Sequence, residues 1–278
     1  MSTRIICVIN DVALENINLR REHGLSLWIE TEYGIVLYDT GQTNEVLSHN
    51  LSVLSLTPQD IQALVLSHAH YDHTGGLETI LAVNPDIPIF AHSDIFRQRF
   101  SLKNGEYQFI GLSQVKEDFP NRFKLNLSYS QVQVVPNLWT TGEIIERQEL
   151  EGRSNNHFIQ TEEGWQSDPY RDDLSLVLET DKGLIVICGC CHAGLLNTLF
   201  HVKQIFKKPI ISVVGGTHLI TADGQSLDHI MEVMIDSFPD LTFHLNHCTG
   251  EDAFHSLAKY FGDRVALFPA EKSIEFSG

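Results

Sequence analysis

The 278-residue sequence has no apolar run that approaches the ~20 residues needed to span a bilayer. Its first ten residues, MSTRIICVIN, contain no long apolar segment followed by a small-residue cleavage site, so we expect no signal peptide. Cysteine is scarce: there are five, an odd number, and three of them fall within positions 188–191. Such a set does not form a disulfide framework, and we expect a protein of the reducing cytoplasm that is not embedded in a membrane.

Basic residues are also few. The chain has 19 Lys and Arg against 36 Asp and Glu, a formal net charge of −17, and no run rich in Lys or Arg. A phosphate backbone would repel such a chain, which argues against sequence-independent binding of nucleic acid. The composition is 42% hydrophobic and 20% charged, which is typical of a globular protein with a sizeable core.

The hydrophobic pattern changes along the chain. Residues 4–10 and 25–38 predict strands, the latter a hairpin with its turn near Gly34, and residues 57–66 predict a capped turn leading into a buried strand. From residue 174 onward, strands alternate with helices. Residues 96–171 are irregular and rich in aromatic and small polar residues. We therefore expect one domain over residues 1–278, with sheets covered by helices on their outer faces and an irregular substrate-side segment at about 96–171.

Residues 64–77, LVLSHAHYDHTGGL, concentrate three histidines and an aspartate within six positions. If the extended backbone of the preceding strand continues, His68 and His70 point the same way and can share one metal ion. Asp72 and His73 follow as the chain turns, so they can serve a second ion. Imidazole and carboxylate groups are typical zinc ligands and also suit iron or manganese.

The run His68-Ala69-His70-Tyr71-Asp72-His73 resembles the H-x-H-x-D-H signature of the metallo-β-lactamase superfamily. The segment IVLYDTG is similar to an early motif of that family, in which an aspartate, here Asp39, lies beside the metals. Asp39 then either orients a ligating histidine or is only a turn residue before Gly41. The resemblance covers the whole chain and implies an α/β (α+β) four-layer αβ/βα sandwich. The relatives with redox di-iron chemistry have glutamate at the position of His70. Since this chain keeps the histidine, the resemblance implies zinc-type hydrolysis instead.

The resemblance also implies further ligands at the ends of later strands. His247, in HLNHCTG, fits the last family position, and His192, in CGCCHAG, is the leading third ligand of the first metal. His157 is the alternative to His192. The family's bridging aspartate is replaced by Gly189-Cys190, so Cys190 either ligates as a thiolate or is a plainly buried cysteine.

The segments GCCHAGLLNT, GGTHL and HCTG are more specific, and they resemble the subgroup that contains the dihydropterin-ribofuranosylaminobenzene-phosphate synthases. The acidic pair Asp172–Asp173 also suits that subgroup, which implies a small phosphorylated or pterin-like anionic ligand. Asp173 and His218 are candidate substrate contacts, although His218 can equally be a hydrogen-bonded loop residue. Aromatic side chains in the irregular segment either wall a pocket or pack into a small core of their own; they are Phe96, Phe100, Tyr107, Phe109 and Trp165.

Three functions remain open. The first is a hydrolase with two divalent metal ions, most often zinc, that attacks a small ester, phosphodiester or lactone through a metal-bound hydroxide, with Asp72 as a catalytic residue that orients the hydroxide. The second is a dihydropterin-type transferase that forms a C–N or C–C bond while pyrophosphate leaves. The third is a metal-binding sensor without turnover. The observation behind this hypothesis is the unusual pair Gly189-Cys190 at the position of the family's bridging aspartate.

Overall fold

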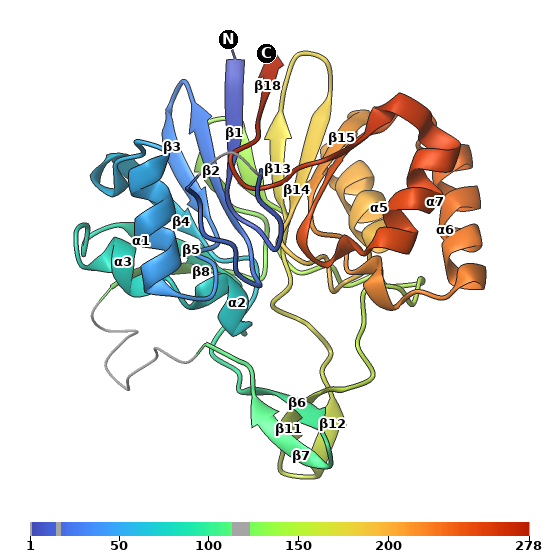
Figure 1. Cartoon of the computed structure of the whole chain (residues 1–278). Helices are drawn as coiled ribbons and strands as arrows, with labels where there is room; N and C mark the ends of the chain where they lie inside the picture. Colours follow the sequence, from blue (N-terminus) through green and yellow to red (C-terminus); the bar gives the residue numbers. More distant parts are fainter. Residues whose placement is uncertain (1, 15–17, 113–122, 278) are drawn as a thin grey trace.

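The computed structural model describes residues 2–14, 18–112 and 123–277. Two seven-stranded sheets face each other, and helices cover the outer side of each (Figure 1). The predicted four-layer sandwich is therefore confirmed. In spatial order, the first sheet consists of β18 (Ser273–Ser277), β1 (Ser2–Ile9), β2 (Ser26–Thr31), β3 (Gly34–Tyr38), β4 (Ile61–Val65), β5 (Pro88–Ala91) and β8 (Lys124–Leu127). The second consists of β17 (Val265–Leu267), β16 (Thr242–Leu245), β15 (Ile210–Gly215), β14 (Leu184–Cys188), β13 (Leu176–Glu179), β10 (Leu138–Thr140) and β9 (Gln133–Val135).

Each sheet has its own set of helices. The first is accompanied by α1 (Asn44–Val53), α2 (Tyr71–Thr74) and α3 (Leu77–Leu81), and the second by α5 (Leu195–Phe206), α6 (Gly224–Ser237) and α7 (Glu251–Phe261). Short 3₁₀-helices are η1 (Pro58–Asp60), η2 (Leu219–Thr221), η3 (His247–Thr249) and η4 (Gly262–Arg264). Among the described residues, no helix has the length and hydropathy needed to cross a membrane.

The core lies in three layers between these elements. One buried cluster joins the inner faces of both sheets, for example Val36 from β3 and Ile187 from β14, and the other two lie between each sheet and its helices. Strand β14 is buried along its whole length because both of its faces are covered, which explains its unbroken apolar sequence LIVIC. Helix α7 buries Ala253, Leu257 and Phe261, a spacing of four that places them on one face.

Parallel pairing brings the functional segments to one edge. β3, β4 and β5 run parallel in the first sheet, and β14, β15, β16 and β17 run parallel in the second. The loops that follow parallel strands leave from the same edge, where open α/β sheets generally bind their ligands. The loop after β4 carries His68, and those after β14, β15 and β16 carry Cys190, His218 and His247.

The irregular segment divides among three sheets. It supplies β8, β9 and β10 to the main sheets, and its remaining strands form a four-stranded sheet that projects below them in Figure 1. That sheet has the order β12 (Gly164–Ser167), β11 (His157–Thr161), β6 (Arg99–Lys103) and β7 (Glu106–Phe109). Tyr107 stacks on Trp165 at a centroid distance of 3.6 Å, and Phe100 lies 5.0 Å from Trp165 and 5.6 Å from Phe109. Four of the five aromatic candidates therefore pack on one another.

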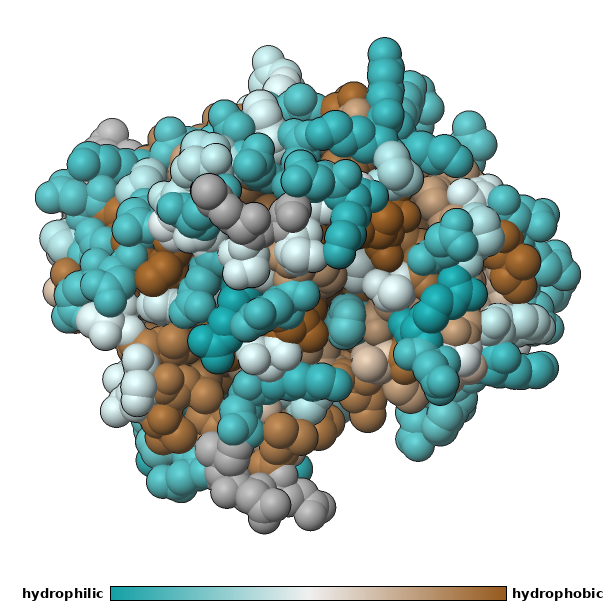
Figure 2. Space-filling model, turned by 90° about the horizontal axis from the view of Figure 1, so that it is seen from above, coloured by the Kyte–Doolittle hydropathy of each residue, from teal (hydrophilic) through white to brown (hydrophobic). Residues whose placement is uncertain are grey.

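Local departures from the predicted elements have identifiable causes. Helix α1 was not predicted; its N-cap is Thr43, whose hydroxyl accepts a hydrogen bond from the Val46 N–H at 3.2 Å. Strand β18 was also missed. The predicted capped turn forms as η1, but the side chain of Thr57, which precedes it, makes no capping hydrogen bond. Viewed from the side of the termini, the surface is mainly hydrophilic, with hydrophobic areas interspersed (Figure 2).

Candidate metal centre

The first donor group combines the β4 loop with the β14 loop. Ligand atoms of His68, His70 and His192 all lie within 4.8 Å of one another, and the three side chains are buried. His68 Nε2 is 3.0 Å from His70 Nδ1. Within the described part of the chain, the buried Nε2 atoms of His70 and His192 have no hydrogen-bond partner. The structure thus brings together the three histidines that the sequence proposed for one ion.

The second donor group contains Asp72, His73 and His247, again within 4.8 Å of one another. Helix α2 carries the first two residues, and η3 begins at the third. His73 Nε2 lies 3.2 Å from His247 Nε2, and Asp72 Oδ2 lies 3.5 Å from each of these nitrogens. This group is also the one that the sequence predicted for a second ion.

Cys190 lies between the two groups. Its Sγ is 3.2 Å from His73 Nε2, and it forms a further close group with His68 and His73. Burial raises the pKa of the Cys190 thiol well above its usual range, so the isolated pocket favours the protonated thiol. The position supports a ligating role for Cys190 over plain burial, because its sulfur points at histidines of both groups.

Asp39 contacts the residues of the histidine motif through its buried carboxylate. This buried residue follows β3, and its Oδ2 lies 2.6 Å from His73 Nδ1. Its carboxylate also accepts hydrogen bonds from the backbone N–H and the hydroxyl of Ser67, each at 2.7 Å, and the Ser67 hydroxyl lies 2.8 Å from His68 Nδ1. Asp39 therefore contacts a motif histidine directly and reaches another through Ser67, an arrangement that fixes ring orientation and tautomer in metal sites.

The protonation states fit metal binding. Burial, with smaller contributions from neighbouring histidines, lowers the pKa of His68, His70 and His192 well below the ordinary value, so these imidazoles are neutral and keep free lone pairs. Burial alone would raise the pKa of Asp72, but His73 and His247 lower it strongly, so its carboxylate is ionised. In the first group, neutral imidazole nitrogens face one another without enough protons to satisfy them, and a divalent cation resolves that conflict. In the second group, burial alone would lower the pKa of His247, but Cys248, Asp11 and Asp72 raise it well above its ordinary value, so an ion bound there would displace that proton.

Two buried carboxylates hold the backbone of the ligand loops. Asp172 Oδ2 accepts a hydrogen bond from Ala69 N–H at 2.8 Å, between His68 and His70, and Asp173 Oδ2 accepts one from Ala193 N–H at 2.9 Å, directly after His192. The contact of Asp173 with a substrate stays a prediction, because the structure shows its carboxylate turned to this backbone.

Behind Asp172 lies a buried charge network that sequence reasoning missed. Arg99, which starts β6, is fully buried and forms ion pairs with Asp172 at 2.7 Å and with Asp168 at 3.2 Å. Arg99 thereby connects the small projecting sheet to the loop that carries His68 and His70. Its sequence neighbourhood, RQRFSL, shows no pattern that marks one arginine as buried.

A second pair of residues was also missed. Asp11 and His23 form a close group with His247, and His23 Nε2 lies 3.4 Å from Asp72 Oδ2. Asp11 Oδ1 lies 3.3 Å from His23 Nδ1 and 3.5 Å from His247 Nδ1. These residues are far from the motif in sequence, and no local signal pairs them with it.

The two remaining candidate histidines lie beside the first group. His157 Nδ1 is 2.9 Å from the Tyr170 hydroxyl, burial lowers its pKa to about 4, and among the described residues it belongs to none of the close donor groups. The geometry therefore favours His192 over His157 beside His68 and His70. The His218 ring lies 4.2 Å from that of His192 and lines a cavity of about 550 Å³ whose polar lining includes Arg153, Ser154, Asn155 and Asn156.

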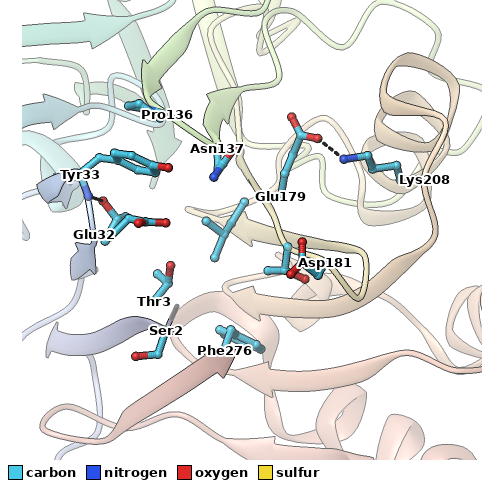
Figure 3. Close-up of a pocket in the computed structure, with 13 residues that line it drawn as sticks. Ser2, Thr3, Glu32, Tyr33, Pro136, Asn137, Glu179, Asp181, Lys208 and Phe276 are labelled. Carbon is cyan, nitrogen blue, oxygen red and sulfur yellow. Dashed lines mark hydrogen bonds and ion pairs between the residues drawn. The ribbon is translucent and has the colours of Figure 1, made fainter. Parts of the chain in front are cut away.

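Another cavity, of about 330 Å³, lies away from the histidines (Figure 3). Its walls come from the start of β1, the β2–β3 turn and the end of β13, where Lys208 pairs with Glu179 at 2.6 Å. These segments lie near the amino ends of the parallel strands β3 and β14, opposite the edge that carries the donor groups. Its lining contains no histidine or cysteine among the residues described, so we do not assign it a catalytic role.

Comparison with known proteins places the chain in a family. The sequence pattern of the metallo-beta-lactamase superfamily matches residues 19–154. The chain is 32% identical over 291 residues to the 7,8-dihydropterin-6-methyl-4-(beta-D-ribofuranosyl)-aminobenzene-5'-phosphate synthase of Methanocaldococcus jannaschii, covering 98% of this chain and 96% of that protein. The chain belongs to the metallo-β-lactamase superfamily.

Solved structures agree on the fold. Tm1679, described as a metal-dependent hydrolase of the beta-lactamase superfamily, superposes with a TM-score of 0.84 at 24% identity, covering 99% of this chain and 100% of that one. The metallo-beta-lactamase fold protein YhfI from Bacillus subtilis gives a TM-score of 0.61 at 11% identity, covering 99% of both chains. At these identities the likeness concerns the fold alone.

Proposed function

We propose that this protein is a metal-dependent hydrolase of a small anionic ester, phosphodiester or lactone. His68, His70 and His192 would hold one divalent ion, and Asp72, His73 and His247 a second, with zinc the most suitable metal and manganese or iron also compatible. The observation that carries the proposal is the pair of adjacent buried donor groups whose nitrogens face one another. When bound, such ions activate water and polarise the electrophile.

The side chains around the donor groups fix the orientation of the ligands and provide a carboxylate for the reaction. Asp39 and Ser67 fix the rings of His73 and His68. The ionised carboxylate of Asp72 has the acceptor capacity to orient the attacking water, which is the catalytic role that we assign to it. Asp172 and Asp173 hold the loops at Ala69 and Ala193 in place, so that the donor atoms need not reorganise during the reaction.

The polar cavity beside His192 and His218 supports a small anionic substrate. A volume of about 550 Å³ is in the range of small-molecule sites, and Arg153 with its asparagine and serine neighbours offers donors to an anionic group. The two carboxylates of the lining have partners outside the cavity: Glu151 accepts the Leu196 N–H at 2.7 Å, and Asp168 pairs with Arg99 at 3.2 Å. The net charge of −17 disfavours a polynucleotide. We therefore assign a small anionic molecule as the partner and neither nucleic acid nor a membrane.

The test is hydrolysis of a panel of activated phosphodiesters, esters and lactones by protein loaded with zinc or manganese. His247→Ala should lower the rate by a factor of about 10² or more, because it removes one of the three donors proposed for the second ion. His229→Ala is the matched control, since His229 is an exposed histidine paired only with Glu149 among the described residues. Equal rates for the two variants would contradict the proposal.

The similarity to the synthase favours a second candidate, a dihydropterin-type transferase. The same donor groups would then hold the ions that supply positive charge to a departing pyrophosphate, while an aminobenzene acceptor forms the new bond. A preparation that releases pyrophosphate from a dihydropterin-methyl pyrophosphate only when that acceptor is present, and that hydrolyses none of the panel, would favour the transferase. Metal binding with silence in both assays would favour the sensor interpretation that the sequence also raised.

A further inference from the structure

We propose that Cys190, His218 and Cys248 form an additional, sulfur-rich metal-binding group beside the two histidine and aspartate groups. Each residue follows a different parallel strand, β14, β15 and β16, so the fold delivers all three to the same edge. Their ligand atoms lie within 4.8 Å of one another. The proposal depends on metal binding by this chain and not on which reaction the chain catalyses.

The backbone of residues 216–218 allows the sulfur of Cys248 to approach closely. The N–H of His218 donates a hydrogen bond to Cys248 Sγ at 3.2 Å, an interaction that favours a thiolate. Gly216 makes this approach possible: a Cβ there would meet Cys248 Sγ at 2.8 Å and the Gly189 carbonyl oxygen at 2.4 Å.

Backbone strain and an unsatisfied nitrogen mark the same place. Cys191, His218 and His247 all have positive φ, at 62°, 46° and 48°, a conformation that side-chain-bearing residues adopt at a cost. Each of them is a member of the group or directly adjacent to one. The buried Nδ1 of His218 has no hydrogen-bond partner in the described part of the chain. A bound cation would give this nitrogen a partner.

The donor set selects a particular class of ion. Two sulfurs and one imidazole suit zinc or another thiophilic ion, whereas the histidine and aspartate groups also accept harder ions. Three protein ligands leave a fourth position for water or an anionic ligand. His218 is only partly buried and lines the 550 Å³ cavity, which provides an entry path. Cys190 also belongs to the group with His68 and His73, so its sulfur lies on the boundary between two ion positions.

The test uses cobalt as a spectroscopic substitute for zinc. Wild-type full-length protein loaded with excess Co²⁺ should show a thiolate-to-cobalt charge-transfer absorption. Cys248→Ser should reduce bound cobalt by about one equivalent and lower that absorption by about half or more, because Cys190 can then ligate as a thiolate only through its group with His68 and His73. Cys191→Ser is the matched control: its sulfur faces Thr198 Oγ1 at 3.3 Å, a contact that serine can keep, and it should leave absorption and stoichiometry unchanged.

Unchanged absorption and cobalt content in folded Cys248→Ser would overturn the proposal. If that variant does not fold, the wild-type protein decides: bound zinc should slow alkylation of Cys248 by iodoacetamide about tenfold, and equal rates with and without zinc would refute it. His70→Ala separates this site from the proposed function. If Cys248→Ser loses cobalt and His70→Ala loses none, the sulfur-rich group is upheld and the hydrolase centre is contradicted. If His70→Ala loses cobalt and Cys248→Ser loses none, the hydrolase centre is upheld and the sulfur-rich group is contradicted.

Discussion

Replacing Arg99 with Met should destabilise the protein far more than an exposed arginine substitution. Arg99 is fully buried and compensates the equally buried carboxylates of Asp168 and Asp172. Removing one partner of a buried ion pair leaves uncompensated charge and costs about 3–5 kcal/mol. Domains of this kind are stable by only about 5–15 kcal/mol, so the loss would be a large share of the total. The measurement is the free energy of unfolding in urea.

The effect of Arg99→Met also has a defined pH dependence. Burial raises the pKa of Asp172 to about 7, even though Arg99 lowers it. Since an unfolded aspartate titrates near 3.9, the folded state binds more protons between these values, and the contribution of Asp172 to stability falls as pH rises through this window. Without Arg99 the folded-state pKa rises further. The deficit of the variant should therefore be larger at about pH 8 than at about pH 5.

The chain supplies its own control in Arg97. Like Arg99, this residue forms an ion pair, in its case with Asp94 at 2.9 Å, but its side chain is 37% exposed. Arg97→Met should therefore lower the free energy of unfolding by less than about 1 kcal/mol. Equal costs for the two variants, or a deficit in Arg99→Met that does not change with pH, would refute the role assigned to this buried network.

Three further predictions follow from the geometry. His192→Ala should lose bound metal, whereas His157→Ala should keep it, as measured by elemental analysis; the opposite pattern would make His157 the ligand. Gly216→Ala should lower the free energy of unfolding by about 1–3 kcal/mol, while Gly224→Ala, where a Cβ meets nothing within 4 Å, should not; equal midpoints in urea would contradict the close approach at Gly216. Burial lowers the pKa of His201, so the stability that its neutral form contributes is present above about pH 6.5 and is lost as pH falls below it. His201→Gln should therefore lose less stability than wild type on acidification, and parallel pH profiles would count against this.

The sequence predicted what is encoded locally. The two-residue period after β4 places His68 and His70 in one donor group, and the step to Asp72 and His73 places those in another. The alternation of strands and helices after residue 174 follows from continuous apolar strands such as β14 and from amphipathic helices such as α7. These patterns depend on neighbours within a few positions, so they are visible in the sequence alone.

What the sequence did not reveal depends on contacts between distant segments. Arg99 is buried only because β6 returns over the loop that carries Asp172, and Asp11 and His23 reach His247 across more than 220 positions. Strand β18 pairs with β1 at the opposite end of the chain. The sulfur-rich group likewise exists only because three parallel strands end side by side.

An anomalous-scattering map, recorded at the zinc absorption edge from crystals of the zinc-loaded protein, tests the central claim most directly. The account predicts one peak within bonding distance of His68, His70 and His192, and a second within bonding distance of Asp72, His73 and His247, at the ~2.0–2.2 Å typical of zinc bound by nitrogen and oxygen. A zinc-loaded crystal that shows no peak at either donor group would contradict it.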